Sequence, residues 1–121
     1  MPYRPDLEET LARYADVWNA TDADQRWAIA HSCFAPDAEY VDPHEAKPVR
    51  GQAAMTAFAA LFQEQVGWTF EWAGAPDTHH GWVRAPWRLV EGGETRATGL
   101  FVASHDDEHR LTRVVHFVDG E

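Results

Sequence analysis

The spacing of apolar residues changes once along this chain, and this change constrains the fold more than any other feature. Up to Gly67, apolar residues recur at helical spacing in three separate segments. From Trp68 onward they alternate as in strands, and Gly92-Gly93 marks a tight hairpin. We therefore expect an α+β fold in which three N-terminal helices pack on one face of a mostly antiparallel sheet. A chain of 121 residues fits a single domain, residues 1–121.

Each expected helix has recognisable ends. Asp6 and Asp22 are N-cap candidates for the first and second helices, and Pro36 lies just beyond the second. The third helix follows Gly51 and ends before Gly67, which occupies the C-cap position. Strands are expected at residues 38–42, 69–73, 80–91, 94–104 and 111–119.

The last expected strand is apolar on both of its faces. Its alternating residues form two sets, Leu111, Val115 and Phe117 on one face and Val114, His116 and Val118 on the other. A sheet that helices cover on one side usually turns a polar second face to water. We therefore expect a second copy of the chain to cover the outer face, in a two-fold homodimer.

Composition excludes several classes of function. The formal net charge is -10, so nucleic acid is not an expected partner, because phosphate binding needs clustered cations. Lys47 is the only lysine, so Schiff-base chemistry would depend on one residue in a polar loop. Cys33 is the only cysteine, which excludes an intrachain disulfide and favours a small buried side chain. Without a long apolar stretch or a signal-peptide pattern, we expect a soluble cytoplasmic protein that does not contact membranes.

The segment FAPDAEYVDP, residues 34–43, ends a short strand on an Asp-Pro step. An acid held at the rim of an apolar hollow is a candidate proton-transfer group, because desolvation raises the pKa of a carboxyl group toward neutrality. Asp42 is such a candidate. Alternatively, Asp42 accepts backbone N–H hydrogen bonds in the turn before Pro43, which is common for aspartate. The pattern leaves both roles open.

The motifs RYADVWNATD, FAPDAEYVDP, HHGWVRAPW and RLTRVVHFVD, with the helix start at Gly51, follow one another in a characteristic order. In this order and spacing the chain resembles the nuclear transport factor two-like (SnoaL-like) superfamily over nearly its whole length. It is most similar to a bacterial branch whose members mostly lack assigned activities. The resemblance implies a cone-shaped barrel, in which a curved sheet wraps around the helices and leaves an internal pocket open at one end.

Among characterised relatives, the ketosteroid isomerases offer the nearest match at the level of residues. By this resemblance, Tyr14 would donate a hydrogen bond to an oxyanion and Asp42 would act as the general base. The strand position of their second oxyanion donor is occupied by Phe101. Loss of one such donor typically costs ~2.7–4 kcal/mol, so a proficient steroid isomerase is not expected. Limonene-epoxide hydrolases have an acid at the position of His116, so their set of carboxylates is absent from this sequence. Polyketide cyclases have a largely apolar pocket, and this sequence is compatible with such a pocket.

The resemblance assigns two groups of residues to the pocket. The candidate catalytic residues are Tyr14, Asp42 and His116. The candidate substrate-binding residues are Trp18, Tyr40, Phe58, Phe62, Trp87 and Phe101. For Tyr14 and His116, packing in the core is the alternative role. The favoured function is an isomerase, cyclase or dehydratase that acts on an apolar or aromatic carbonyl compound and needs no metal or other cofactor. The alternative is a non-catalytic protein that binds an apolar metabolite.

Histidine residues raise the question of a metal site. His44, Asp42 and one of His79 and His80 would supply three ligands, but no further spacing supports this. Rim positions or dimer contacts are the expected roles of these histidines.

Because side chains alternate between the two faces of a strand, Arg84 and Trp87 cannot both face the pocket unless Pro86 introduces a bulge. We expect Trp87 to face the pocket and Arg84 to lie at the dimer face or at the pocket mouth.

Overall fold

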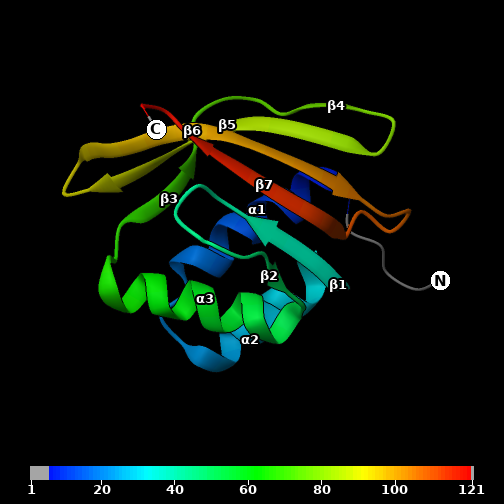
Figure 1. The fold of residues 1–121 in the computed structure, drawn as a ribbon, viewed down its shortest axis with the longest axis horizontal. Helices are drawn as coiled ribbons and strands as arrows, with labels where there is room; N and C mark the ends of the chain where they lie inside the picture. Colours follow the sequence, from blue (N-terminus) through cyan, green and yellow to red (C-terminus); the bar gives the residue numbers. More distant parts are fainter. Residues whose placement is uncertain (1–5, 121) are drawn as a thin grey trace.

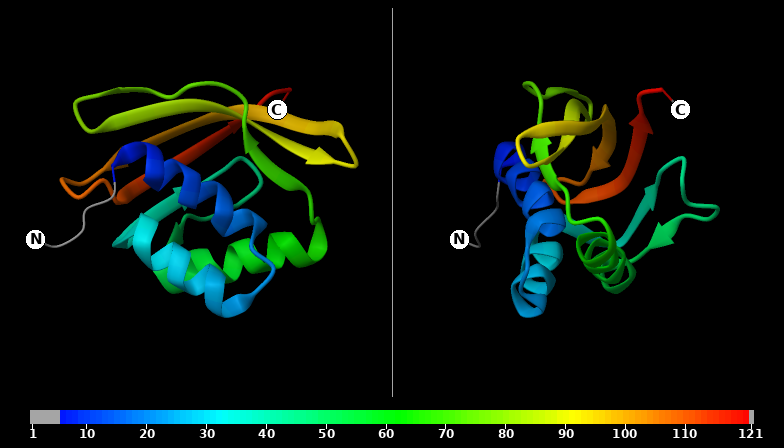
Figure 2. Two further views of the ribbon diagram at one scale, coloured as in Figure 1. Left: turned by 180° about the vertical axis from the view of Figure 1, so that it is seen from behind. Right: turned by 90° about the vertical axis from the view of Figure 1, so that its left-hand side faces the viewer.

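Residues 6–120 are described by a computed structural model, which confirms the α+β class (Figure 1). The elements are α1 (Leu7–Asn19), α2 (Ala23–Cys33), β1 (Phe34–Val41), β2 (Val49–Arg50), α3 (Gln52–Gln65), β3 (Thr69–Trp72), β4 (Asp77–His79), β5 (Trp82–Glu91), β6 (Glu94–His105) and β7 (Leu111–Val118). All three helices lie on one side of a strongly curved sheet (Figure 2). In this part of the chain, no helix has the length and apolar character needed to cross a membrane.

The strands pair in the order β2-β1-β7-β6-β5-β3, and β4 pairs with β5. Every pair is antiparallel except β1 with β7, where Tyr40 lies opposite Val114 in a parallel register. β2 forms one edge of the sheet, and β3 and β4 form the other, each beside a different part of β5. The sheet therefore curves around the helices as the resemblance implies, but it stays open and does not close into a barrel.

The helix ends form where the sequence predicts them. The Asp6 carboxylate accepts a hydrogen bond from the Glu9 N–H at 2.8 Å, and the Asp22 carboxylate accepts one from the Gln25 N–H at 2.8 Å. Each bond satisfies a backbone donor that the first turn of a helix leaves without a partner. Gly67 follows α3 with φ of 72°, a left-handed conformation that suits glycine at a helix C-terminus.

A buried arginine connects the first two helices. Arg26 in α2 is only 5% exposed, and its guanidinium donates hydrogen bonds to the carbonyl oxygens of Val17 and Ala20. These carbonyls belong to the last turn of α1 and its C-cap, where the helix itself provides no donors. The positive charge also lies at the negative end of the α1 dipole. Arg26 therefore holds the end of α1 that carries Trp18 into the pocket.

The first strand differs from its prediction. β1 begins at Phe34, directly after α2, rather than at residue 38. Its register with β7 shifts between Phe34 and Glu39. This interval contains Pro36, which has no N–H to donate to a strand ladder, so an irregularity there is expected.

The strand expected at residues 80–91 is also shorter than predicted. His80, with φ of 50°, and Gly81, with φ of 80°, form a turn. This turn joins β5 to β4, a short strand that the sequence pattern does not show. Two consecutive residues with positive φ match the twist of a hairpin, which explains why the chain reverses here.

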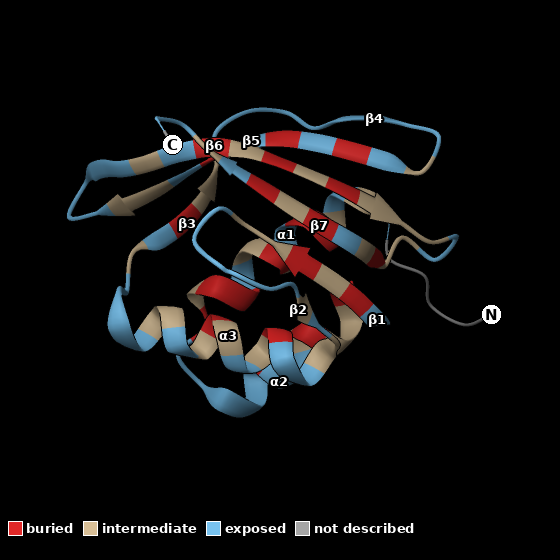
Figure 3. Ribbon diagram, viewed as in Figure 1, coloured by how far each residue is buried: buried red, intermediate tan, exposed pale blue. Residues whose placement is uncertain are grey.

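Alternation along β5 separates the core from the surface, and Figure 3 shows it as alternating bands of buried and exposed residues. Ala85 and Trp87 point toward the helices and are buried, whereas Arg84 is exposed on the outer face. Pro86 pairs with Leu100 in regular register, so it introduces no bulge. Trp87 therefore faces inward and Arg84 outward, as expected.

A glycine on β6 leaves space for the Trp87 ring. A Cβ atom on Gly99 would collide with the indole of Trp87 and with the carbonyl oxygen of Phe117. Gly99 and Trp87 are also direct partners across the β5–β6 pair. The absence of a side chain at Gly99 thus lets the Trp87 ring lie against the sheet and form one wall of the pocket.

Candidate active site

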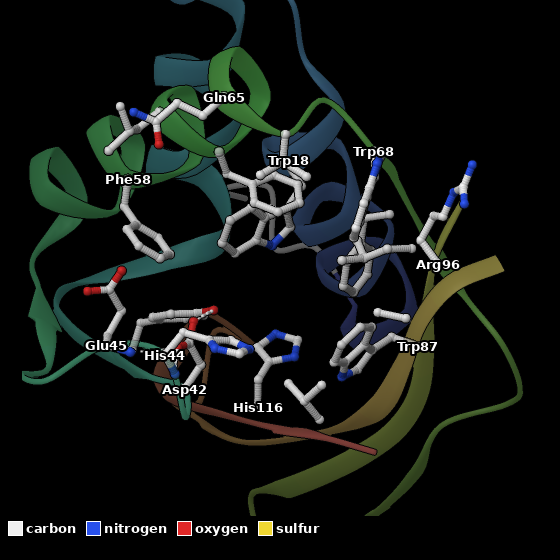
Figure 4. Close-up of a pocket in the computed structure, with 18 residues that line it drawn as sticks. Trp18, Asp42, His44, Glu45, Phe58, Gln65, Trp68, Trp87, Arg96 and His116 are labelled. Carbon is white, nitrogen blue, oxygen red and sulfur yellow. Dashed lines mark hydrogen bonds between the residues drawn. The ribbon is translucent and has the colours of Figure 1, made fainter. Parts of the chain in front are cut away.

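A cavity of about 540 Å³ lies between the helices and the concave face of the sheet (Figure 4). Its apolar walls contain seven aromatic side chains, Trp18, Tyr40, Phe58, Phe62, Trp68, Phe70 and Trp87. Its polar lining residues are Asp42, His44, Glu45, Gln65, Arg96 and His116. The cavity therefore suits a largely apolar ligand with a few polar groups.

Asp42 follows β1 directly and lies at the rim of this cavity. Its Oδ1 atom accepts backbone N–H hydrogen bonds from His44 at 2.8 Å and from Glu45 at 3.0 Å. Its Oδ2 atom accepts a hydrogen bond from the Tyr40 hydroxyl at 2.6 Å. The turn role that the sequence leaves open is therefore present, and the same carboxylate still borders the cavity. These three donors hold the carboxylate in one orientation.

His116 lies on β7 and contributes an imidazole to the floor of the cavity. Its Nε2 atom is 2.6 Å from the hydroxyl oxygen of Tyr14, which lies deeper in the core. Within residues 6–120, its Nδ1 atom makes no hydrogen bond. Burial lowers the pKa of His116 to about 3, and the negative charge of Asp42 opposes this only in part. The imidazole is therefore neutral at ordinary pH, with one ring nitrogen paired to Tyr14 and the other available to a ligand.

Tyr14 and Tyr40 both remain protonated in this environment. Burial raises the pKa of the Tyr14 hydroxyl well above its ordinary value, and nearby negative charge adds to this effect. For Tyr40, burial again raises the pKa, and the Tyr14 and Asp42 side chains raise it further. The two phenols therefore act as neutral hydrogen-bonding groups, one beneath His116 and the other beneath Asp42.

Seven of the nine residues predicted for the site line the cavity, and two do not. Tyr14 is fully buried beneath His116, so its hydroxyl meets the imidazole and not the cavity. Phe101 is also fully buried, with its ring 5.0 Å from that of Tyr14 and 5.6 Å from that of His116. Tyr14 and Phe101 therefore lie behind the cavity lining, and the rings of both contact the imidazole of His116.

Several lining residues were not predicted from the sequence, whereas His44, expected at a rim position or a dimer contact, does line the cavity. Glu45 follows Asp42 in the same turn, and its proximity to a candidate base was the available signal. Trp68 and Arg96 line the opposite end of the cavity, from the segments before β3 and within β6. No sequence pattern near these two residues identifies them as cavity residues, because the pairing of β3 with β5 and of β5 with β6 brings them to the cavity.

A second, smaller hollow of about 300 Å³ lies at the ends of β1 and β7. It shares Asp42 and His116 with the main cavity. Its other residues include Val115 and Phe117, which alternate with His116 along β7 and so belong to the outer face of the sheet. Asp42 and His116 are therefore bordered by hollows on both sides of the sheet.

His79 and His80 lie apart from this centre. The rings of His79 and His80 contact each other at the turn between β4 and β5, and both residues are exposed. Neither residue lines the main cavity, whereas His44 does. Between residues 6 and 120, no three His, Cys, Asp or Glu side chains are grouped so that they could hold a metal ion.

Arg84 lies on the outer face, where its guanidinium pairs with Asp77 at 3.1 Å. It does not line the main cavity. Of the two positions expected for this residue, the structure therefore shows the outer face of the sheet.

Comparison with solved structures agrees with this architecture. A provisionally named isomerase of the SnoaL-like family from Agrobacterium tumefaciens is 33% identical to this chain, with a TM-score of 0.83 over 94% of this chain and 97% of that one. The chain belongs to the SnoaL-like family. No family model matches the sequence, and a search of curated proteins found no match.

More distant solved structures share the fold alone. A provisionally named ketosteroid isomerase from Kribbella flavida is 19% identical, with a TM-score of 0.70 over 93% of this chain and 76% of that one. A protein of unknown function with a cystatin-like fold from Methylobium petroleophilum is 17% identical, with a TM-score of 0.76 over 95% of this chain and 76% of that one.

Proposed function

We propose that this SnoaL-like protein is an isomerase or cyclase that moves a proton on an apolar or aromatic carbonyl compound. The observation that carries the proposal is the position of Asp42 and His116, which border one cavity from the neighbouring strands β1 and β7. The names of SnoaL-like neighbours, which include provisional isomerases and polyketide cyclases, support the same general type of reaction.

In this proposal Asp42 is the general base. Its carboxylate takes a proton from the carbon next to the ligand carbonyl, the C–H electron pair forms a carbon–carbon double bond, and the carbonyl π electrons move to oxygen. In a ligand with a β,γ double bond, Asp42 then returns the proton to the γ carbon while the oxyanion re-forms the carbonyl. The double bond thereby moves into conjugation with the carbonyl, which completes an isomerisation. The hydrogen bonds from Tyr40, His44 and Glu45 keep the carboxylate in position between the two steps.

His116 is proposed to bind the carbonyl oxygen. If the Tyr14 hydroxyl donates its hydrogen bond to Nε2, the single ring proton resides on Nδ1, which is then the donor toward the cavity. A neutral imidazole is a suitable donor because it stabilises a developing negative charge without itself gaining charge. Tyr14 therefore acts as a positioning residue that sets the tautomer of His116, and the donor role expected for Tyr14 passes to the histidine.

Hydrogen exchange tests this mechanism. We expect the wild-type protein to exchange the hydrogen next to the carbonyl of a cyclic aromatic ketone, such as a tetralone, for solvent deuterium. The Asp42→Asn variant should lose this activity, because the amide cannot accept the proton, and Asp37→Asn provides a matched control on the exposed part of β1. Equal exchange rates with wild type and Asp42→Asn would reject the proposal.

The second candidate is a protein that binds an apolar ligand without changing it. Two observations favour it: Asp42 already accepts three hydrogen bonds, two of them within its own turn, and the fully buried Phe101 supplies no second oxyanion donor. Binding of an aromatic ketone that proceeds without exchange, and that Asp42→Asn leaves unchanged, would favour this candidate over the enzyme.

We also propose that a second copy of the chain covers the outer face of the sheet. An apolar strip crosses this face along registered strand positions, and its members are Val41, Pro86, Leu100, Val102, Val115 and Phe117. Charged residues beside the strip pair with each other, as Arg84 does with Asp77 at 3.1 Å and Arg88 with Glu71 at 2.9 Å. In a chain of net charge -10, such a balanced face lets two copies approach without strong repulsion.

The oligomeric state tests this interface. We expect wild type to have the mass of a dimer by light scattering, and Phe117→Asp to have the mass of a monomer, because Phe117 is 56% exposed on this strip. Trp27→Asp is the matched control, since Trp27 is an exposed aromatic residue on α2, far from the sheet face. A monomeric wild type, or an unaltered Phe117→Asp dimer, would contradict the proposal.

A further inference from the structure

Negative charge at the main cavity is not balanced by positive charge. Asp42 and Glu45 line one end, and no lysine or arginine among residues 6–120 forms an ion pair with either carboxylate. Arg96 lines the other end, but its guanidinium lies 3.1 Å from the Glu91 carboxylate and 3.4 Å from the Glu94 carboxylate. Figure 4 shows these two ends, with Glu45 and Asp42 below Phe58 and Arg96 on the far side. Among residues 6–120, the only lysine or arginine that lines the cavity is thus already paired with two acids of its own hairpin.

The nearby carboxylates affect the pKa values of two side chains in the cavity wall. After burial, the Tyr14 side chain and then the Asp42 and Glu45 carboxylates raise the pKa of Tyr40 further. At His116, Asp42 acts in the direction that favours a positive charge, although burial dominates. Both effects have the sign expected of the two carboxylates at this end of the cavity.

The aromatic walls add a second attraction for a positive charge. Trp18, Tyr40 and Phe58 form a cluster beside Asp42, with ring centroids 5.2–5.7 Å apart. The face of an aromatic ring carries partial negative charge and attracts an ammonium group, most strongly where water is excluded. Phe58 and Glu45 lie at the same end of the cavity in Figure 4, so a cation there would meet both a ring and a carboxylate.

We infer that the ligand of this cavity carries a positive charge: it is an aromatic or polycyclic molecule with a protonated or quaternary amine that binds at the Asp42–Glu45 end. The inference rests on the proposal that this cavity is the functional site, and it adds the charge of the ligand. An anionic ligand is disfavoured at both ends, because it would face Asp42 and Glu45 at one and would have to compete with Glu91 and Glu94 for Arg96 at the other.

Three probes of nearly equal size test the inference: naphthylmethylammonium, naphthylmethanol and naphthoate, which are cationic, neutral and anionic. Their binding can be measured by calorimetry or by quenching of tryptophan fluorescence at about pH 7.5, where an alkylamine is charged and an ordinary histidine is mostly neutral. We expect the ammonium to bind roughly three- to thirtyfold more tightly than the alcohol. Naphthoate should bind least well of the three.

Substitution of Glu45 separates the local effect from the overall charge of the protein. Glu45→Gln should reduce the preference for the ammonium over the alcohol and improve the binding of naphthoate. Glu8→Gln is the matched control, because Glu8 is exposed in the first turn of α1, at the opposite end of that helix from Trp18. It should leave all three affinities unchanged, since a distant exposed charge is screened by salt.

Three outcomes would overturn the inference: equal binding of the alcohol and the ammonium, tightest binding of naphthoate, or equal effects of Glu45→Gln and Glu8→Gln. None of the three probes carries a ketone with an exchangeable hydrogen beside it. The binding experiment is therefore independent of the hydrogen-exchange test, and a failure of the proposed chemistry leaves the charge preference to be decided on its own.

Discussion

Replacement of His116 by glutamine tests whether this imidazole is held neutral inside the fold. Burial lowers the pKa of His116 to about 3 in the folded protein, against a reference value of 6.5. Below pH 6.5 the unfolded chain therefore binds a proton that the folded chain does not bind until about pH 3. The contribution of His116 to stability is complete above pH 6.5 and is lost progressively as the pH falls toward 3.

The size of the effect follows from this shift. One pKa unit corresponds to ~1.36 kcal/mol, so wild type should lose about 2 kcal/mol of unfolding free energy relative to His116→Gln between about pH 7 and pH 5. Only the difference between the two proteins is informative, because both contain the same 20 aspartate and glutamate residues. Glutamine is a suitable replacement because its amide oxygen can still accept a hydrogen bond from Tyr14 without titrating.

Urea unfolding at a series of pH values, followed by tryptophan fluorescence, measures this difference. His79→Gln is the matched control, because His79 is an exposed histidine at the end of β4 and does not line the cavity. The reasoning would be refuted if the difference in unfolding free energy between wild type and His116→Gln stayed constant between about pH 7 and pH 5. An NMR titration in which His116 of the folded protein gains its proton near the ordinary histidine value would refute it as well.

Three further predictions concern the framework of the site. Gly99→Ala should lower the unfolding free energy by at least ~1–3 kcal/mol, because the added methyl collides with Trp87; urea unfolding checks this, and an unchanged midpoint would contradict it. Asn19→Asp should cost ~1–3 kcal/mol in the same assay, because the Asn19 amide donates to and accepts from the Phe70 backbone at 2.9 and 2.8 Å and a carboxylate cannot donate. The Cys33 thiol should resist a thiolate-specific reagent in the folded protein and react in denaturant, since burial raises its pKa; rapid labelling of the folded protein would show that this burial is wrong.

Local chemistry explains most of what the sequence predicted correctly. The caps at Asp6 and Asp22 depend only on residues three positions away, so the pattern contains all the information required. The inward position of Trp87 follows from the alternation of β5. The start of β1 at Phe34 could not be read in this way, because that strand pairs with β7 at the other end of the chain.

The candidate site also combines features that nearby residues determine with contacts between distant parts of the chain. The assignment of Asp42 to the pocket came from a local motif, and so did its turn hydrogen bonds. The contact between Tyr14 and His116 joins residues 102 positions apart, and it could not be derived from spacing. Resemblance placed Tyr14 at the pocket, but only the structure shows that its hydroxyl meets the His116 imidazole and that Tyr14 does not line the cavity.

The hollow shared by Asp42 and His116 on the outer side of the sheet has a consequence for how the protein works at low concentration. If a second copy covers the outer face as proposed, it also covers this hollow. The proposed exchange activity per subunit should then rise with protein concentration as subunits associate, and a constant specific activity would contradict this link.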